Sequence, residues 1–166
     1  YIESYLTNFP GYYETGDAGY KDEDGYLYIM SRTDDVINVA GHRLSTGAME
    51  EAVSNHNDVA ECAVVGVLDN LKGQVPLGLV CLNNGCNKTN EVICKEIIDL
   101  VRNQIGPVAA FKSVAVVSAL PKTRSGKILR ATIRKIVDKV DWELPATVDN
   151  PLVFDEIREA IKPLGY

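Results

Sequence analysis

The sequence predicts an α+β fold, in which a small three-stranded sheet with flanking helices is preceded by a β-hairpin. Short apolar runs at residues 62–68, 75–82 and 113–117 have the length and residue types of buried strands. Amphipathic segments with helical spacing are interleaved with these runs, as a compact α+β sandwich requires. No Gly-rich turn joins a strand to a helix, which disfavours a dinucleotide-binding fold.

The hairpin is expected near the start of the chain, after an aromatic, Gly-rich opening segment. Asp24-Gly25 is a strong tight-turn signal, and apolar residues alternate after it. The acidic residues at this turn resemble a calcium loop only superficially, since the glycine is misplaced. The polar segment 31–35 lies between two strand-like runs. We therefore expect a domain boundary there, with domains 1–34 and 35–166.

The second region continues with alternating short strands and helices. Its further elements are expected as a strand at 36–39, helices at about 46–56 and 90–105, an amphipathic helix that continues directly from the basic loop at 120–130 with apolar residues at helical spacing from Ile128 to Val140, and a short helix opened by 150–151. Gly106-Pro107 marks the end of the longest helix, because a glycine just past the last turn and a following proline stop helices.

Composition bounds the function classes. With 46% hydrophobic and 24% charged residues, the chain is that of an ordinary soluble globule. Its net charge of −6 argues against a nucleic-acid partner, so any phosphate site must be local. No apolar run is long enough to span a bilayer. The four cysteines form neither a metal-binding nor a disulfide pattern, which favours free thiols. Because the first residue is Tyr1 rather than Met, we expect the tail of a longer protein.

The basic loop is the strongest single chemical signal. Four cations lie within residues 120–130, on a loop punctuated by Pro121 and Gly126. Lys127 is best placed to bring an ammonium group beside a phosphate or carboxylate. The loop is not a Walker A motif, because Ile128 follows the Gly-Lys pair where Ser or Thr is needed. The alternative is that these cations only coat the start of a helix.

Other candidate residues are individually weaker. Asp17 follows a Thr-Gly turn and can accept hydrogen bonds from two vicinal hydroxyls, or it can be an ordinary turn aspartate. Arg32 can serve the same ligand or pair with a nearby aspartate. Gly41 allows a close approach to its backbone, and Arg43 can reach a phosphate. Arg102 lies off the apolar stripe of its helix, as an anion contact or a solvated surface residue.

Together these blocks resemble the C-terminal portion of AMP-forming acyl-CoA synthetases, in the acetate/propionate branch of the adenylate-forming superfamily. The resemblance is carried by residues 13–17, 24–32, 34–43, 102–107 and 121–127. The segments 30–32 and 106–111 look more like propionyl-CoA than acetyl-CoA synthetases.

The resemblance implies that the full-length protein is an ATP-dependent short-chain acyl-CoA ligase. It would join propionate or acetate to AMP, with release of pyrophosphate, and then transfer the acyl group to CoA. Residues 1–34 would end the large domain and 35–166 would form the small lid domain. Alone, the chain is expected to be inactive, since the phosphate loop, adenine motif and acyl pocket lie upstream. The implied cofactor is ATP with Mg²⁺, and the location is cytoplasmic or the mitochondrial matrix.

The resemblance also implies roles for single residues in adenylation. Lys127 would be the catalytic residue, neutralising charge at the carboxylate and α-phosphate. Asp17 and Arg32 would contact the ATP ribose, and Arg43 a nucleotide phosphate. Asp34 would be the hinge of the lid. In this family the lysine that matches Lys127 can be acylated, which removes its charge, so regulatory acylation is implied too.

A second set of residues is implied for CoA and a metal ion. Ala40, Gly41 and Arg102 would contact CoA. Relatives bind a metal through backbone carbonyls near His56, which implies Ser54, His56 and Val59 here. Residues 141–166 match the family only loosely, and we assign them to packing on the lid. No membrane partner is expected.

Two alternatives stay open on the sequence. The chain can be the lid of another adenylating enzyme, such as a peptide-synthetase adenylation domain that serves a carrier protein. Gly41-His42-Arg43 and Arg102 suit free CoA better, and no carrier-type serine motif follows. It can also be a non-catalytic interaction module. Such a module could have other residues at the positions of Lys127 and Asp17, but both residues are present.

Overall fold

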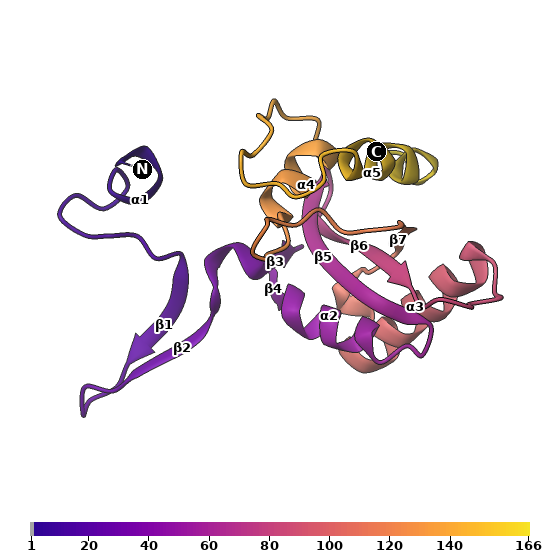
Figure 1. Ribbon diagram of the computed structural model, residues 1–166. Coiled ribbons are helices and arrows are strands. Elements are labelled where there is room, and N and C mark those ends of the chain that lie inside the picture. The colour runs from indigo at the N-terminus through magenta and orange to yellow at the C-terminus, as the bar shows by residue number, and fades with distance from the viewer. Residues whose placement is uncertain (1) are drawn as a thin grey trace. The chain divides into compact units, whose positions relative to one another are not determined.

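The computed structural model describes residues 2–166, apart from the side chains of residues 3, 4, 30, 31 and 34. Its elements are α1 (Ile2–Tyr5), β1 (Asp17–Lys21), β2 (Leu27–Arg32), β3 (Val36–Val39), β4 (His42–Ser45), α2 (Thr46–Ser54), β5 (Val59–Asp69), β6 (Gly73–Leu82), α3 (Asn90–Ile105), β7 (Ser113–Val116), α4 (Arg130–Val137) and α5 (Val153–Ile161), with 3₁₀ turns at Thr33–Asp35, Pro107–Ala109 and Lys162–Leu164 (Figure 1). The chain divides into two compact units, Tyr1–Val36 and Ile37–Tyr166.

The first unit contains the expected hairpin. Strands β1 and β2 pair antiparallel, with Lys21 opposite Leu27 at the turn end. The turn is closed by Asp22, whose side chain accepts the Tyr26 N–H at 2.8 Å and whose carbonyl accepts the Gly25 N–H at 3.1 Å. The prediction of a hairpin in this region is therefore confirmed.

The second unit is built on a sheet of five strands, two more than predicted. Strands β5 and β6 form a long antiparallel pair, and β7 runs parallel to β6. These are the three strands expected from the apolar runs. The short strands β3 and β4 extend the sheet, with β3 joined to β6 through the pair Val39 and Gly73. The expected 36–39 strand thus belongs to the same sheet, and the α+β class is confirmed.

The sheet separates two hydrophobic cores, because its side chains alternate between faces. Residues 63, 65 and 67 of β5 pack with α4 and α5, whereas Val64 packs with α2 and α3. Figure 1 shows the same layering, with α4 and α5 covering one face and α2 and α3 the other. Within the described residues, no helix has both the length and the apolar character needed to cross a membrane.

Two helix boundaries differ from expectation. Helix α2 ends at Ser54, because the N–H groups of Asn55 and His56 bond to carbonyls only three residues back. Helix α4 starts at Arg130, since Ile128 still forms a bridge with Lys122. Helix α3 ends before Gly106 as predicted, with that glycine at a φ of +101°.

Candidate functional site

Asp17 and Arg32 face each other across the β1–β2 hairpin as cross-strand partners. Both side chains are exposed. The hairpin is fastened beside them, because the N–H and hydroxyl of Thr33 both donate to the Gly16 carbonyl, at 2.8 and 3.0 Å. The hairpin therefore brings the two residues assigned to ribose binding together.

The β3–β4 turn consists of Ala40 and Gly41, with φ values of +49° and +90°. Two consecutive positive φ angles are what a type I′ hairpin turn needs. The Gly41 N–H donates to Asn38 Oδ1 at 3.1 Å, and the Ala40 N–H donates to the Lys72 carbonyl at 2.8 Å. Since that N–H is already bonded, any ligand contact from Ala40 must use its carbonyl oxygen. A Cβ added to Gly41 would meet no atom within 4 Å, so open space adjoins this turn.

A cationic pocket of about 320 Å³ lies next to that turn in the fold. Lys72, Arg102 and Lys112 line it, with Phe111 and the Gly106-Pro107 segment supplying apolar wall. No salt bridge joins any of these three cations to a carboxylate within the described part of the chain. Because Lys72 also holds Ala40, the pocket and the turn share one residue. Ala40 and Arg102, predicted separately, therefore belong to one region.

Asp69 orders the turn that carries Lys72. Its Oδ1 accepts the N–H groups of Lys72 and Leu71, at 2.8 and 2.9 Å. These hydrogen bonds, first that from Lys72, lower the pKa of Asp69 below its ordinary value. The carboxylate is therefore ionised at neutral pH and fixes the backbone of Lys72, one of the residues that line the pocket.

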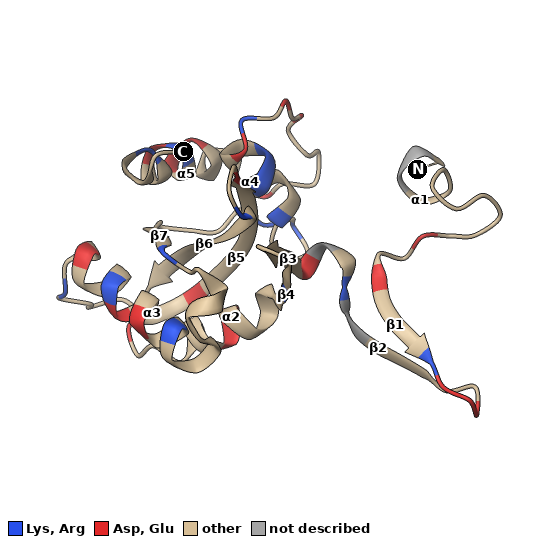
Figure 2. Cartoon of the chain, turned by 180° about the vertical axis from the view of Figure 1, so that it is seen from behind, with Lys and Arg blue, Asp and Glu red and all other residues tan. Residues whose placement is uncertain are grey.

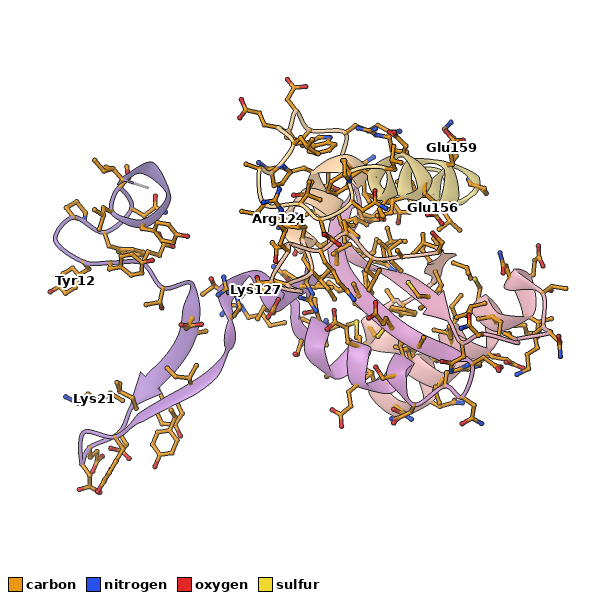
Figure 3. The ribbon with its side chains drawn as sticks, in the orientation of Figure 1. Tyr12, Lys21, Arg124, Lys127, Glu156 and Glu159 are labelled. Atoms are coloured by element: carbon orange, nitrogen blue, oxygen red, sulfur yellow. The ribbon has the colours of Figure 1, made fainter. Side chains whose placement is uncertain are left out.

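The Lys127 loop is tightly closed rather than flexible. The Thr123 N–H donates to the Lys127 carbonyl at 2.8 Å, and the Lys127 N–H donates to Thr123 Oγ1 at 3.1 Å. A β-turn lies between them, with the Gly126 N–H bonded to the Thr123 carbonyl. Gly126 has a φ of +84°, which glycine adopts without strain. Lys127 is exposed and forms no salt bridge with a described carboxylate, so its ammonium group is available to a ligand (Figure 3).

An ion pair anchors the helix that follows this loop. Arg130 Nε and Nη2 donate to the two Glu50 oxygens at 3.0 and 2.8 Å, a bidentate contact between α4 and α2. Glu50 Oε1 also accepts the Val64 N–H at 2.8 Å. Basic residues mark α4 and the loop before it in Figure 2. The start of α4, three residues beyond Lys127, is therefore fixed.

The segment predicted to bind a metal through backbone carbonyls also carries a cluster of side chains. His56, Asp58 and Glu96 each offer one ligand atom within 4.8 Å of the others. The Lys88 ammonium lies 2.9 Å from Asp58 Oδ2 and 2.8 Å from Glu96 Oε2. The Lys88 ammonium therefore already neutralises the Asp58 and Glu96 carboxylates. While these ion pairs are formed, the three side chains do not suit a metal ion. Of the predicted backbone ligands, the His56 carbonyl accepts the Val59 N–H at 3.0 Å.

Comparison with known proteins decides the family. Residues 48–127 match the model of the AMP-binding enzyme C-terminal domain. The chain carries an AMP-binding enzyme C-terminal domain. This match and the relatives described next confirm the resemblance to the C-terminal portion of acyl-CoA synthetases, whereas the preference for propionyl-CoA synthetases stays a prediction.

Relatives extend this match beyond the domain model. The chain is 59% identical to the uncharacterized protein PA3568 of Pseudomonas aeruginosa, over 98% of this chain and 26% of that protein. It is 53% identical to the human mitochondrial acyl-CoA synthetase short-chain family member 3, over 95% of this chain and 23% of that protein. The crystal structure of Brucella canis acyl-CoA synthetase superposes with a TM-score of 0.61 at 36% identity, over 78% of this chain and 24% of that one. The chain thus spans about a quarter of the length of its curated relatives.

Sequence reasoning missed several residues of this AMP-binding enzyme C-terminal domain. Lys72 and Lys112 share the pocket with Arg102, but neither stands in a recognisable motif. The Glu50–Arg130 pair joins residues 80 positions apart, which no local pattern can reveal. Arg43 is exposed on β4, as expected for an anion contact. The side chain of the expected hinge, Asp34, lies outside the described residues.

Proposed function

We propose that this domain is the lid of an ATP-dependent short-chain acyl-CoA ligase, which acts on propionate or acetate in the full-length protein. The observation that carries the proposal is that Lys127 is exposed on a hydrogen-bonded loop and has no salt bridge to any carboxylate that the structure describes. A cation held in this way can meet a ligand's negative charge without first leaving another partner. The names of the similar acyl-CoA synthetases support the same reaction class.

In the first half-reaction, a carboxylate oxygen of the substrate attacks the α-phosphorus of ATP and pyrophosphate leaves. Lys127 would hold its ammonium group between the carboxylate and the α-phosphate, where it offsets their mutual repulsion. This is positioning and electrostatic stabilisation rather than proton transfer. Asp17 would accept the ribose hydroxyls and Arg32 would add a second ribose contact, since both stand together on the hairpin.

In the second half-reaction, the CoA thiolate attacks the acyl carbon and AMP leaves. Gly41 would border the path of the pantetheine arm, because its missing side chain leaves open space. Arg102 would bind CoA phosphate, with Lys72 and Lys112 adding positive charge to the same pocket. Arg43 would contact the nucleotide phosphate. The Ala40 carbonyl would contact the pantetheine amides.

The two halves require the lid to present different surfaces in turn. We propose that residues 1–34 end a large domain, that 35–166 form the lid, and that Asp34 is the hinge between them. Rotation would withdraw Lys127 and bring the Ala40–Arg43 turn to the acyl-adenylate. Such a motion lets one active site exclude water differently in each step.

Mg²⁺ would enter with ATP, where a divalent ion neutralises the phosphate oxygens. A further ion bound by the carbonyls of Ser54, His56 and Val59 stays a proposal, and those carbonyls would act without the side-chain cluster that Lys88 fills. Acylation of Lys127 would remove its charge and switch adenylation off. The compartment is proposed as the cytoplasm or the mitochondrial matrix, the latter in keeping with the name of the human relative.

The test uses the full-length parent enzyme, as wild type and as Lys127→Ala, in two separate assays. One measures carboxylate-dependent pyrophosphate exchange, and the other measures thioester formation from preformed acyl-adenylate and CoA. We expect exchange to fall ~10²- to 10³-fold, the usual loss for one stabilising group, while thioester formation survives.

Two other results would sink the proposal. If both activities survive in Lys127→Ala, Lys127 has no catalytic role and the basic loop only caps the helix that follows it. Equal loss of both would mean that Lys127 supports the structure rather than one chemical step.

A further inference from the structure

The last part of the chain does more than pack on the lid. Residues 147–149 run beside residues 122–124 of the Lys127 loop and form a short antiparallel ladder with them. Thr123 and Val148 form a bridge, the Arg124 N–H donates to the Thr147 carbonyl at 3.0 Å, and the Asp149 N–H donates to the Lys122 carbonyl at 2.9 Å. A segment more than twenty residues downstream thus bonds directly to the backbone of the loop.

Thr123 connects this ladder to Lys127. Its N–H donates to the Lys127 carbonyl, and its hydroxyl accepts the Lys127 N–H. The same residue forms the bridge with Val148. Any shift of Thr123 therefore moves the backbone of Lys127, and the ladder opposes such a shift.

The downstream segment can act as an anchor because it is itself fixed. Val148 is 8% exposed and lies in the core cluster of α5, with Phe154 and Ile157. Trp142 packs on Phe154 with ring centroids 4.9 Å apart. The Asn150 side chain accepts the Leu152 N–H at 3.1 Å, which orders the entry to α5.

Helix α5 also holds the chain on the other side of the loop. The Glu156 carboxylate accepts both the N–H and the hydroxyl of Ser118, just after β7. Lys122 Nζ reaches Glu61 Oε1 on β5 at 2.5 Å. Figure 3 labels Arg124 and Lys127 on the loop and Glu156 on α5. The Lys127 loop is thus attached at three points. These are Ser118 before the loop, Lys122 at its start and the pairing of residues 122–124 with residues 147–149.

Core packing alone does not account for the ladder. The apolar residues of α5 would bury the same surface without it, and Arg124, Thr147 and Asp149 are exposed. Exposed backbone groups can bond to water instead, so these bonds add little net stability. What they add is a direct backbone attachment at Thr123, the residue that also bonds to Lys127.

We propose that residues 147–149 form a strap that positions Lys127 for adenylation, with the main chains of Arg124 and Asp149 as the positioning groups. The inference rests on the proposed role of Lys127. A displacement of ~1 Å at a reacting group can cost ~10²-fold in rate. The strap should therefore act on the first half-reaction and leave the second unchanged, since Lys127 is withdrawn there.

Two proline variants remove one strap bond each, from opposite strands of the ladder. Asp149→Pro removes the N–H that donates to Lys122. Arg124→Pro removes the N–H that donates to Thr147, and Arg124 is the second residue of the Thr123–Gly126 β-turn, where proline is favoured. Asp149→Ala and Arg124→Ala are the matched controls, because they lose the side chain and keep the N–H.

In the full-length enzyme, each proline variant should lower kcat for pyrophosphate exchange ~10- to 100-fold relative to its alanine control. The KM for ATP and the rate of thioester formation should stay within about twofold. The amide hydrogen of Lys127 should exchange faster in the proline variants, since its acceptor Thr123 is loosened. The thermal midpoint, measured for all four variants, reports folding.

Other outcomes overturn the strap. If both half-reactions fall together with the thermal midpoint, the ladder is a stability element. If the proline and alanine variants have the same rates, the ladder does not position Lys127. Lys127→Ala, measured in parallel, separates the two proposals. If this variant keeps pyrophosphate exchange, the proposed role of Lys127 is wrong. If it loses exchange while the proline variants keep it, only the proposed strap is wrong.

Discussion

Two loops of this domain, the Ala40–Gly41 turn and the Lys127 loop, carry its candidate functional residues. They differ in how many contacts with distant residues fix their positions. The Ala40–Gly41 turn is set largely by its own residues, through two positive φ angles and a bond to Asn38 only three positions away, and one distant backbone bond joins Ala40 to Lys72. The Lys127 loop has a local β-turn too, but its edge bonds to residues 147–149 and its following helix to Glu50. The turn is specified mostly by nearby residues and has one bond to a distant residue, whereas the Lys127 loop has several attachments to distant parts of the chain.

The difference matches the two tasks proposed for these loops. A turn that borders a substrate path needs open space, which the absent side chain of Gly41 supplies. A cation that must meet a developing charge needs a fixed position, which only several independent attachments can supply. The comparison therefore predicts that the two loops respond differently to substitution.

The largest expected effect comes from filling the open space at the turn. Gly41→Leu adds a side chain at a φ of +90°, where L-residues are strained, and obstructs the proposed pantetheine path. We expect thioester formation from preformed acyl-adenylate to fall ~100-fold and pyrophosphate exchange to stay within about threefold. Gly41→Ala should show a smaller loss in the same assay. Equal losses in both half-reactions would show that the turn is only structural.

The pocket gives the next largest effect. Arg102→Ala removes a charged donor, which is worth ~1.5–3 kcal/mol, so the KM for CoA should rise ~10- to 100-fold with kcat little changed. Lys112→Ala should raise it only ~2- to 5-fold, because both side chains are exposed and the lysine ammonium cannot make the bidentate phosphate contact that the Arg102 guanidinium can. Steady-state kinetics at two salt concentrations would check both values. An unchanged KM for Arg102→Ala would remove the pocket from CoA binding.

The anchor of α4 should affect stability. Glu50 and Arg130 are 18% and 35% exposed, and Glu50→Ala removes the bidentate contact to the guanidinium and the acceptor of the Val64 N–H. We expect a loss of ~1–3 kcal/mol in the free energy of unfolding, measured by urea denaturation. Arg130→Lys should lose less, since it keeps the charge but not the bidentate geometry. A neutral Glu50→Ala would mean that α4 is held by its apolar face alone.

The smallest effect concerns the Lys88 cluster. Hydrogen bonds from Lys88 and then His56 lower the pKa of Glu96 below its ordinary 4.5, while Glu96 and then Asp58 raise the pKa of Lys88 above its ordinary 10.5. The Glu96 carboxylate therefore favours folding above about pH 4.5, and this contribution is lost as the pH falls through its lower folded-state value. The Lys88 contribution persists until the pH rises past about 10.5.

Glu96→Gln should accordingly lower the thermal midpoint slightly at pH 7, and the difference from wild type should vanish as the pH falls well below 4.5. The side chains of Lys88 and Glu96 are both about two-fifths exposed, so the change in the thermal midpoint should be small. A difference that stayed constant after the Glu96 carboxylate of the folded protein has been protonated would assign the effect to packing instead of charge.

The sequence predicted those features that local patterns encode. The hairpin turn at Asp24-Gly25, the three central strands and the end of α3 at Gly106 follow from turn chemistry and periodicity, and the structure confirms them. The extra strand pairing of β3 was missed, because it rests on the single pair Val39 and Gly73 far apart in sequence. Lys72, Lys112 and the 147–149 ladder were missed for the same reason. Contacts between distant residues leave no periodic signal.

The two separate cores of the sheet have a consequence for how such enzymes diversify. The pocket with Arg102 lies on the α2–α3 side, whereas the Lys127 loop and residues 147–149 rest on the α4–α5 side. Substitutions that change the proposed CoA pocket can therefore accumulate on one side without repacking the other. The Glu50–Arg130 pair is a tie between the helices of the two sides. A lineage that changes its acceptor while keeping its carboxylate chemistry should vary on the first side and conserve that tie.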